Sequence, residues 1–138
     1  MTDPQTPSAP AAAILLVVED DPEIGNALVA YGRHRGFEVF YAPDGPMGVT
    51  LGERVRPDVI LLDIALPGLD GRDVFMALKK SGVTEHSVVI FTTARDGQLD
   101  RVAGLEMGAA EYETKPFQLA TLFTKVEALL EKKRAGRL

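Results

Sequence analysis

Cysteine and tryptophan are both missing from this chain of 138 residues. Without cysteine the chain has no disulfide framework, no thiolate zinc site and no cysteine nucleophile. No apolar stretch approaches the roughly 18 residues that a membrane-spanning helix needs. The longest stretch, Ala9–Val18, contains a proline and runs directly into acidic residues, and no basic segment precedes it, which argues against a signal peptide. We therefore expect a cytoplasmic protein that makes no membrane contact.

Positive charge is also scarce, because 15 Lys and Arg stand against 20 Asp and Glu, a formal net charge of −5. This mild acidity argues against direct nucleic-acid binding by the chain. The length favours a single domain, and the hydrophobic fraction of 46% is that of a globular protein. We predict a disordered Pro- and Ala-rich tail over residues 1–12, one domain over residues 13–134, and a short basic tail over residues 135–138.

From residue 14 onward, short apolar runs alternate with segments of helical periodicity. The runs, which we interpret as strands, are Ile14–Val18, Val39–Tyr41, Val59–Leu62, Val88–Phe91 and a weaker one near Tyr112. The helical segments begin at Pro22 and then cover about residues 46–55, 72–80, 98–107 and 119–134. Repeated strand–helix alternation predicts a parallel sheet with helices on both faces. Right-handed crossovers leave few topologies for it.

Polar residues with complementary chemistry follow the predicted strands. Glu19, Asp20 and Asp21 follow the first strand, Asp63 ends the third, Thr93 ends the fourth and Lys115 follows the fifth. The carboxyl ends of parallel strands share one edge, where ligands bind. Two carboxylates about 4 Å apart repel by about 4 kcal/mol, and Mg²⁺ offsets such repulsion well. The pattern predicts a Mg²⁺ site beside Asp63, whose carboxylate would be the nucleophile in phosphoryl transfer, with Lys115 and Thr93 neutralising phosphoryl oxygens.

Each of these residues also has an ordinary interpretation when it is taken alone. Asp21 is a good helix N-cap, and Asp58 and Asp70 are best interpreted as turn residues. An isolated threonine or lysine at a strand end is more often structural or exposed. We interpret His34 and His86 as surface residues. The joint spacing of the polar groups, rather than any single residue, favours a site.

The motifs together resemble a known family, the receiver domain of two-component response regulators, over about Ile14–Lys133. The matching segments are Ile14–Asp21, Pro57–Asp63, Leu66–Gly71, Thr93–Arg95, and Gly108–Ala109 leading to Tyr112 and Lys115–Phe117. The resemblance implies an α/β, flavodoxin-like, doubly wound fold. Its five-stranded parallel sheet would have the strand order 2-1-3-4-5, with five helices.

The resemblance also implies a role for individual residues. Asp63 corresponds to the phosphoacceptor. The Mg²⁺ ligands would be Glu19, Asp20, Asp63 and the carbonyl of Ala65, with Glu19 acting through water. Thr93, Ala94 and Lys115 would bind the phosphoryl group, and Tyr112 would be the aromatic switch that turns inward when Thr93 moves. The Lys115–Pro116 peptide bond would be cis, which an X–Pro bond tolerates.

A receiver of this kind implies signalling partners rather than an enzymatic activity of its own. A sensor histidine kinase or a histidine phosphotransfer protein would supply the phosphoryl group. Phosphorylation would switch the face formed by the fourth helix, fifth strand and fifth helix, which would bind a downstream protein target. A homodimer through that face is a further expectation, although Ala110, Thr121 and Lys125 depart from the usual charged pattern.

Two alternatives stay open at this point. The first is a Mg²⁺-dependent phosphatase with an aspartyl nucleophile; such enzymes usually carry a second Asp two residues later, where this chain has Ala65, which cannot transfer protons. The second is the receiver portion of a DNA-binding transcriptional regulator. No output domain follows Leu138 in the sequence, so a stand-alone receiver and a piece of a longer regulator are both expected, while Met1 favours a natural start.

Overall fold

A computed structural model of the protein describes residues 11–94 and 108–138. The elements in chain order are β1 (Ile14–Val18), α1 (Pro22–His34), β2 (Glu38–Ala42), α2 (Gly45–Val55), β3 (Val59–Asp63), α3 (Gly71–Lys80), α4 (Val83–His86), β4 (Val88–Thr93), β5 (Glu111–Thr114) and α6 (Leu119–Arg134). The strands form one sheet in the order β2-β1-β3-β4-β5, and each neighbouring pair is parallel. This confirms the predicted fold class and strand order. The helix expected at about residues 98–107 lies outside the described residues.

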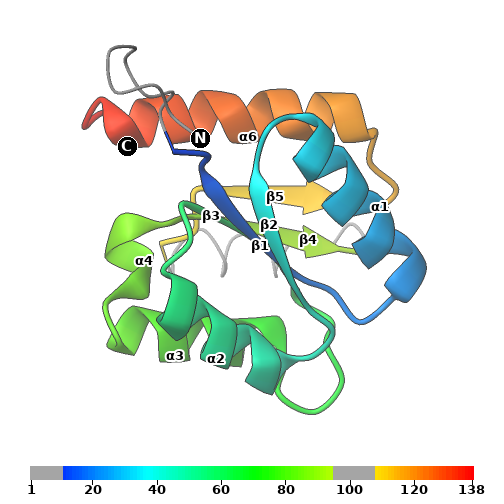
Figure 1. Ribbon diagram of the computed structural model, residues 1–138. Coiled ribbons are helices and arrows are strands. Elements are labelled where there is room, and N and C mark those ends of the chain that lie inside the picture. The colour runs from blue at the N-terminus through cyan, green and yellow to red at the C-terminus, as the bar shows by residue number, and fades with distance from the viewer. Residues whose placement is uncertain (1–10, 95–107) are drawn as a thin grey trace, which may run out of the picture.

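Two layers of helices cover the sheet (Figure 1). Helices α1 and α6 lie over one face, and α2, α3 and α4 lie over the other. Because successive strand residues point to opposite faces, Leu15 and Val17 of β1 pack under the first layer, and Leu16 and Val18 pack under the second. The central strands are buried on both sides, which explains their nearly continuous apolar sequences. Within the described residues, no helix combines the length and apolarity needed to cross a bilayer.

Three of the helices begin with an aspartate cap. In each, the side chain accepts a hydrogen bond from a main-chain N–H that the first helical turn leaves without a partner. The pairs are Asp21 with Glu23 at 2.9 Å, Asp44 with Met47 at 2.8 Å, and Asp70 with Arg72 at 2.8 Å. The cap predicted at Asp21 is therefore present. Asp70, which we expected only to form a turn, instead starts α3.

Asp58 lies at the amino edge of the sheet, where the strands begin. The sequence predicted it to be a simple turn residue. Its Oδ2 accepts a hydrogen bond from the Ile14 main-chain N–H at 2.7 Å. Its Oδ1 lies 3.2 Å from Nε2 of His86, whose side chain is 51% exposed. His86 belongs to α4, a helix of four residues that the periodicity of the sequence did not predict. Asp58 therefore connects β1, the start of β3 and the segment that leads into β4.

Candidate functional site

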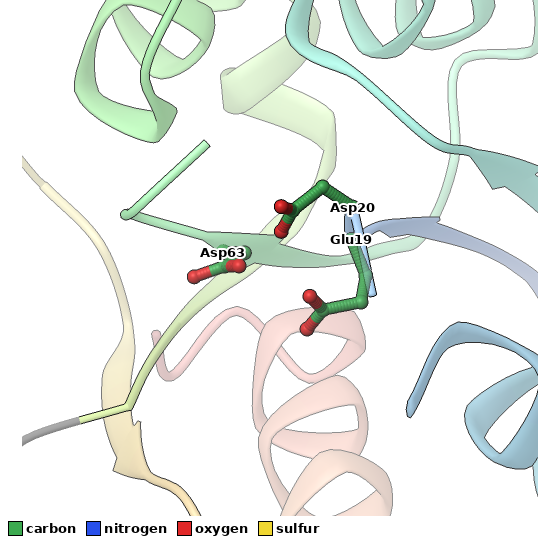
Figure 2. Close-up of side chains that lie close together, drawn as sticks. All are labelled: Glu19, Asp20 and Asp63. Carbon is green, nitrogen blue, oxygen red and sulfur yellow. The ribbon is translucent and has the colours of Figure 1, made fainter. Parts of the chain in front are cut away.

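Three carboxylates lie together where β1 and β3 end (Figure 2). One ligand oxygen from each of Glu19, Asp20 and Asp63 lies within 4.8 Å of the others. The strands place them there, because Val18 pairs with Leu62 in the parallel β1–β3 register, so that Glu19, just past the end of β1, comes beside Asp63, the last residue of β3. Glu19 and Asp63 are buried, whereas Asp20 is exposed. The structure thus brings together the acidic residues that the strand ends suggested.

Among the described residues, Lys115 brings a positive charge into contact with this cluster. Its Nζ lies 2.7 Å from Oε1 of Glu19 and 3.3 Å from Oδ2 of Asp63. The side chains are only 12% exposed for Lys115 and 1% for Glu19. Two buried carboxylates therefore share one ammonium, and a third carboxylate lies beside them. Within the part of the chain that the structure describes, the cluster has an excess of negative charge.

The pKa values in the cluster reflect this crowding. Burial raises the pKa of Glu19 to about 7, and the charge of Asp63 adds to the rise, while hydrogen bonds from Lys115 and the Asp21 main chain oppose it. Burial alone would lower the pKa of Lys115, but its hydrogen bond to Glu19 and the charge of Asp63 outweigh that effect and raise it. A site with this excess of carboxylate oxygen favours a further cation. The donor set fits a small, hard divalent ion such as Mg²⁺.

Two further predicted residues, Ala65 and Thr93, lie in the loop after β3 and at the end of β4. The Ala65 N–H donates to Oδ1 of Asp63 at 3.1 Å, so the loop after β3 orients the carboxylate. Thr93 is the buried last residue of β4, and its carbonyl accepts from the Lys115 N–H at 2.6 Å. The Lys115–Pro116 peptide bond is cis, as the resemblance implied. The main chain of β4 therefore holds the loop that carries the lysine.

A groove of about 500 Å³ opens beside Lys115 and has no counterpart in the sequence predictions. It lies between the first turns of α1 and the loop that joins β5 to α6. Most of its lining is apolar, and the residues that form it are Glu23, Ile24, Ala27, Ala94, Lys115, Pro116, Phe117 and Leu119. Ala94, a predicted phosphoryl ligand, therefore lies at a surface that adjoins the acidic cluster.

Tyr112 occupies the interior of the molecule. Its side chain is only 3% exposed, and its ring centroid lies 6.4 Å from that of Phe91 in the core. The ring is therefore already directed inward in this structure. Its predicted role as a switch stays a prediction.

One contact of the site escaped the sequence predictions. The hydroxyl of Tyr41, in β2, donates to the main-chain carbonyl of Glu19 at 2.8 Å. In the sequence, Tyr41 is simply the last aromatic residue of an apolar strand. Only the β1–β2 register, which sets Tyr41 opposite Val17, places its hydroxyl next to the acidic pair.

Curated relatives agree with this geometry. Residues 15–127 match the response regulator receiver domain family. Sensory transduction protein RegX3 of Mycobacterium tuberculosis is 39% identical over 119 residues, which are 86% of this chain and 51% of that protein. Transcriptional activator protein PfeR of Pseudomonas aeruginosa is 41% identical over 124 residues, 90% of this chain and 40% of that protein. The chain thus spans about half, or less, of the length of these relatives.

Solved structures give the same answer. The receiver domain of sensor histidine kinase PA1611 from Pseudomonas aeruginosa, described with a magnesium ion coordinated in its active-site cleft, is 32% identical, with a TM-score of 0.78 and coverage of 88% of this chain and 99% of that one. A CheY-like receiver domain protein from Methanospirillum hungatei is 25% identical, with a TM-score of 0.83 and coverage of 91% and 98%. The family match, the curated relatives and the shared fold show that this chain belongs to the response regulator receiver domains of two-component signalling.

Proposed function

We propose that this receiver accepts a phosphoryl group on Asp63 from a sensor histidine kinase or a histidine phosphotransfer protein, in a Mg²⁺-dependent reaction. The observation that carries the proposal is the position of Asp63. Its carboxylate is buried next to two further carboxylates, and its Oδ2 lies 3.3 Å from the Lys115 ammonium. Phosphoryl transfer requires positive charge around the phosphoryl oxygens, which Lys115 would supply together with a Mg²⁺ ion held by the carboxylates.

The residues of the chain have distinct tasks in this reaction. One oxygen of Asp63 attacks the phosphorus of a phosphohistidine, the P–N bond breaks, and the donor imidazole leaves and takes a proton from solvent. The Ala65 N–H and Lys115 each hold one Asp63 oxygen, which fixes the orientation of the carboxylate before the attack. Lys115 then neutralises part of the charge on the phosphoryl oxygens.

The metal ligands we propose are Glu19, Asp20, Asp63 and the carbonyl of Ala65, with Glu19 acting through water. The three carboxylates offer the clustered hard oxygen donors that this ion prefers. When bound, Mg²⁺ supplies positive charge to the phosphoryl oxygens and offsets the repulsion among the carboxylates.

Signalling follows from the new phosphoryl group. We propose that the Thr93 hydroxyl and the Ala94 N–H bind it, and that Tyr112 responds. The face that includes β5 and α6 then changes its arrangement and engages a downstream protein target; the fourth helix expected beside it lies outside the described residues. A homodimer through this face is a separate proposal. On that face Lys125 forms ion pairs with Glu113 and, at 4.0 Å, with Glu111 of its own chain. Separation of the phosphorylated protein by size would test the dimer.

We also propose that residues 13–134 form the receiver, flanked by tails at residues 1–12 and 135–138, and that it serves as a signalling module rather than an enzyme. An alternative is a role as the receiver portion of a transcriptional regulator. The names and greater lengths of PfeR and the Mycobacterium tuberculosis regulator TrcR, which is 37% identical over 118 residues, support that alternative.

Labelling by a small phosphodonor tests the proposal. The protein is incubated with acetyl phosphate and Mg²⁺, and its intact mass is measured. We expect the wild type to gain one phosphoryl group and Asp63→Asn to gain none. Asp58→Asn is the matched control, because it makes the same change at the opposite edge of the sheet. We expect it to be labelled to the same extent as the wild type. Equal labelling of Asp63→Asn and the wild type would refute the assignment of the phosphoacceptor.

A further inference from the structure

The main chain of Glu19 is tied to β2 at two points. Its N–H donates to the carbonyl of Ala42 at 3.1 Å, and its carbonyl accepts from the Tyr41 hydroxyl at 2.8 Å. Regular pairing between the two strands ends at Val18 and Ala42, one residue earlier. Glu19 is 1% exposed, and a carbonyl on so buried a residue needs a donor. The phenol of Tyr41 supplies that donor where the strand pairing ends.

The first turns of α1 leave space for the phenol ring. A Cβ atom at Gly25 would lie 2.5 Å from Cε1 of Tyr41 and 2.6 Å from its hydroxyl oxygen. Real Cβ atoms do not approach other heavy atoms so closely, so any side chain at this position would displace the ring. The position of the Tyr41 phenol therefore depends on the absence of a side chain at Gly25, although the two residues belong to different elements.

The carbonyl that accepts this hydrogen bond belongs to the peptide group between Glu19 and Asp20. That group is planar, so its orientation influences where both side chains leave the backbone. The Glu19 carboxylate is held at its other end, because Oε1 lies 2.7 Å from Lys115 Nζ and Oε2 accepts from the Asp21 N–H at 3.1 Å. Without the phenol, the peptide between the two acidic residues loses its side-chain hydrogen bond.

We infer that Tyr41 is a positioning residue of the metal site: its hydroxyl fixes the Glu19–Asp20 peptide and so holds both carboxylates ready for Mg²⁺. The inference rests on the proposed function and adds a residue to it. Hydrogen-bond partners that orient ligands without touching the metal typically change its affinity by about tenfold or more. The phenol reaches the ligands through the main chain, so the same order of effect is expected.

Mg²⁺ affinity of the full chain, measured by calorimetry, tests the inference. Tyr41→Phe keeps the ring and removes the hydroxyl, and we expect Mg²⁺ to bind about tenfold more weakly. Labelling by acetyl phosphate should fall at limiting Mg²⁺ and recover at saturating Mg²⁺, which a general loss of folded protein would not produce. Urea unfolding establishes that each variant is folded.

Tyr31→Phe is the matched control. The hydroxyl of Tyr31 accepts from Nη1 of Arg35, the C-cap residue of α1, at 3.2 Å. Its loss removes a comparable hydrogen bond that does not involve Glu19, Asp20 or Asp63. Mg²⁺ affinity should then equal that of the wild type. Gly25→Ala tests the same hydrogen bond without a change to the tyrosine itself. The added methyl group displaces the ring of Tyr41, so we expect weaker Mg²⁺ binding.

The possible outcomes distinguish a failure of the role inferred for Tyr41 from a failure of the proposed function. If the wild type binds Mg²⁺ and both Tyr41→Phe and Gly25→Ala bind it equally well, the inference is wrong and the proposed function stands. Equal weakening by Tyr31→Phe and Tyr41→Phe would also overturn the inference, because it would indicate a general effect of destabilisation. A wild type that binds no Mg²⁺ and accepts no phosphoryl group would overturn both.

Discussion

The two edges of the sheet treat acidic side chains in opposite ways. At the amino edge, Asp58 has a partner for each of its oxygens, the Ile14 N–H and the His86 imidazole. At the carboxyl edge, Glu19 and Asp63 share the single ammonium of Lys115, and Asp20 adds a third carboxylate within 4.8 Å. The first arrangement joins strands, whereas the second retains repulsion that reduces the stability of the fold. Excess negative charge at one edge of the sheet, where the other edge has its acidic side chain paired, indicates where a ligand binds.

Removal of the shared lysine should have the largest effect on stability. Lys115→Met removes the ammonium that pairs with two buried carboxylates, and we expect the metal-free protein to lose about 3 kcal/mol of unfolding free energy at pH 8. Urea unfolding measures the loss. The control is Lys125→Met, which removes a more exposed ion pair on α6 and should cost less than about 1 kcal/mol. Equal losses in the two variants would show that Lys115 is not a buried counter-ion.

The raised pKa of Glu19 predicts a pH dependence of stability at the carboxyl edge. The folded chain holds this proton to about pH 7, whereas the unfolded chain releases it near the ordinary value of 4.5. Stability that depends on this proton is therefore present below about pH 4.5 and is lost as the pH rises through about 7, a loss of about 3 kcal/mol.

This pH dependence appears as a difference between two proteins. Urea midpoints of the wild type and of Glu19→Gln are compared across this pH range without Mg²⁺, so that the titration of other groups cancels. The wild type should lose stability relative to the variant as the pH rises. A constant difference would contradict the raised pKa.

Matched aspartate-to-asparagine substitutions should have opposite signs at the two edges. Asp63→Asn removes one of the crowded charges, and we expect it to stabilise the metal-free fold by about 1 kcal/mol. Asp58→Asn weakens a charge-assisted hydrogen bond to the Ile14 N–H and should destabilise by about 1 kcal/mol. Urea midpoints measure both. Destabilisation by Asp63→Asn would indicate that the carboxyl edge is as well compensated as the amino edge.

The smallest effect is expected at His86. Its side chain is half exposed, so its pair with Asp58 is accessible to solvent, and His86→Ala should cost no more than about 0.5 kcal/mol. A loss above about 1 kcal/mol would show that the imidazole, and not only the Ile14 N–H, is needed to hold the amino edge.

The sequence predicted the scaffold where its residues are buried on both faces of the sheet. The apolar runs of β1, β3 and β4 identified these strands, and the strand ends identified Glu19, Asp20 and Asp63 as neighbours. The glycines of α2 weakened the helix prediction, because glycine lowers helix propensity. The structure explains one of them: a Cβ at Gly48 would lie 2.9 Å from Val18, so the residue allows close packing of α2 on β1.

Other features of the fold and the site could not be predicted from local patterns in the sequence. Helix α4 is too short to show a period, and in β5 only Tyr112 is buried, so this edge strand has a weak signal. The contacts of Asp58 with Ile14, and of Tyr41 with Glu19, join residues that are distant in sequence and depend on the strand register. The raised pKa of Glu19 likewise results from burial, which the acidic sequence around it does not indicate.

The most direct measurement is to locate the phosphoryl group. The protein is labelled with acetyl phosphate, with and without EDTA, and the labelled peptide is identified by tandem mass spectrometry. We predict that the label lies on Asp63 alone and that EDTA abolishes it. Label on another residue, or label on Asp63 that is unaffected by metal removal, would contradict a Mg²⁺-dependent phosphoacceptor at the carboxyl edge of the sheet.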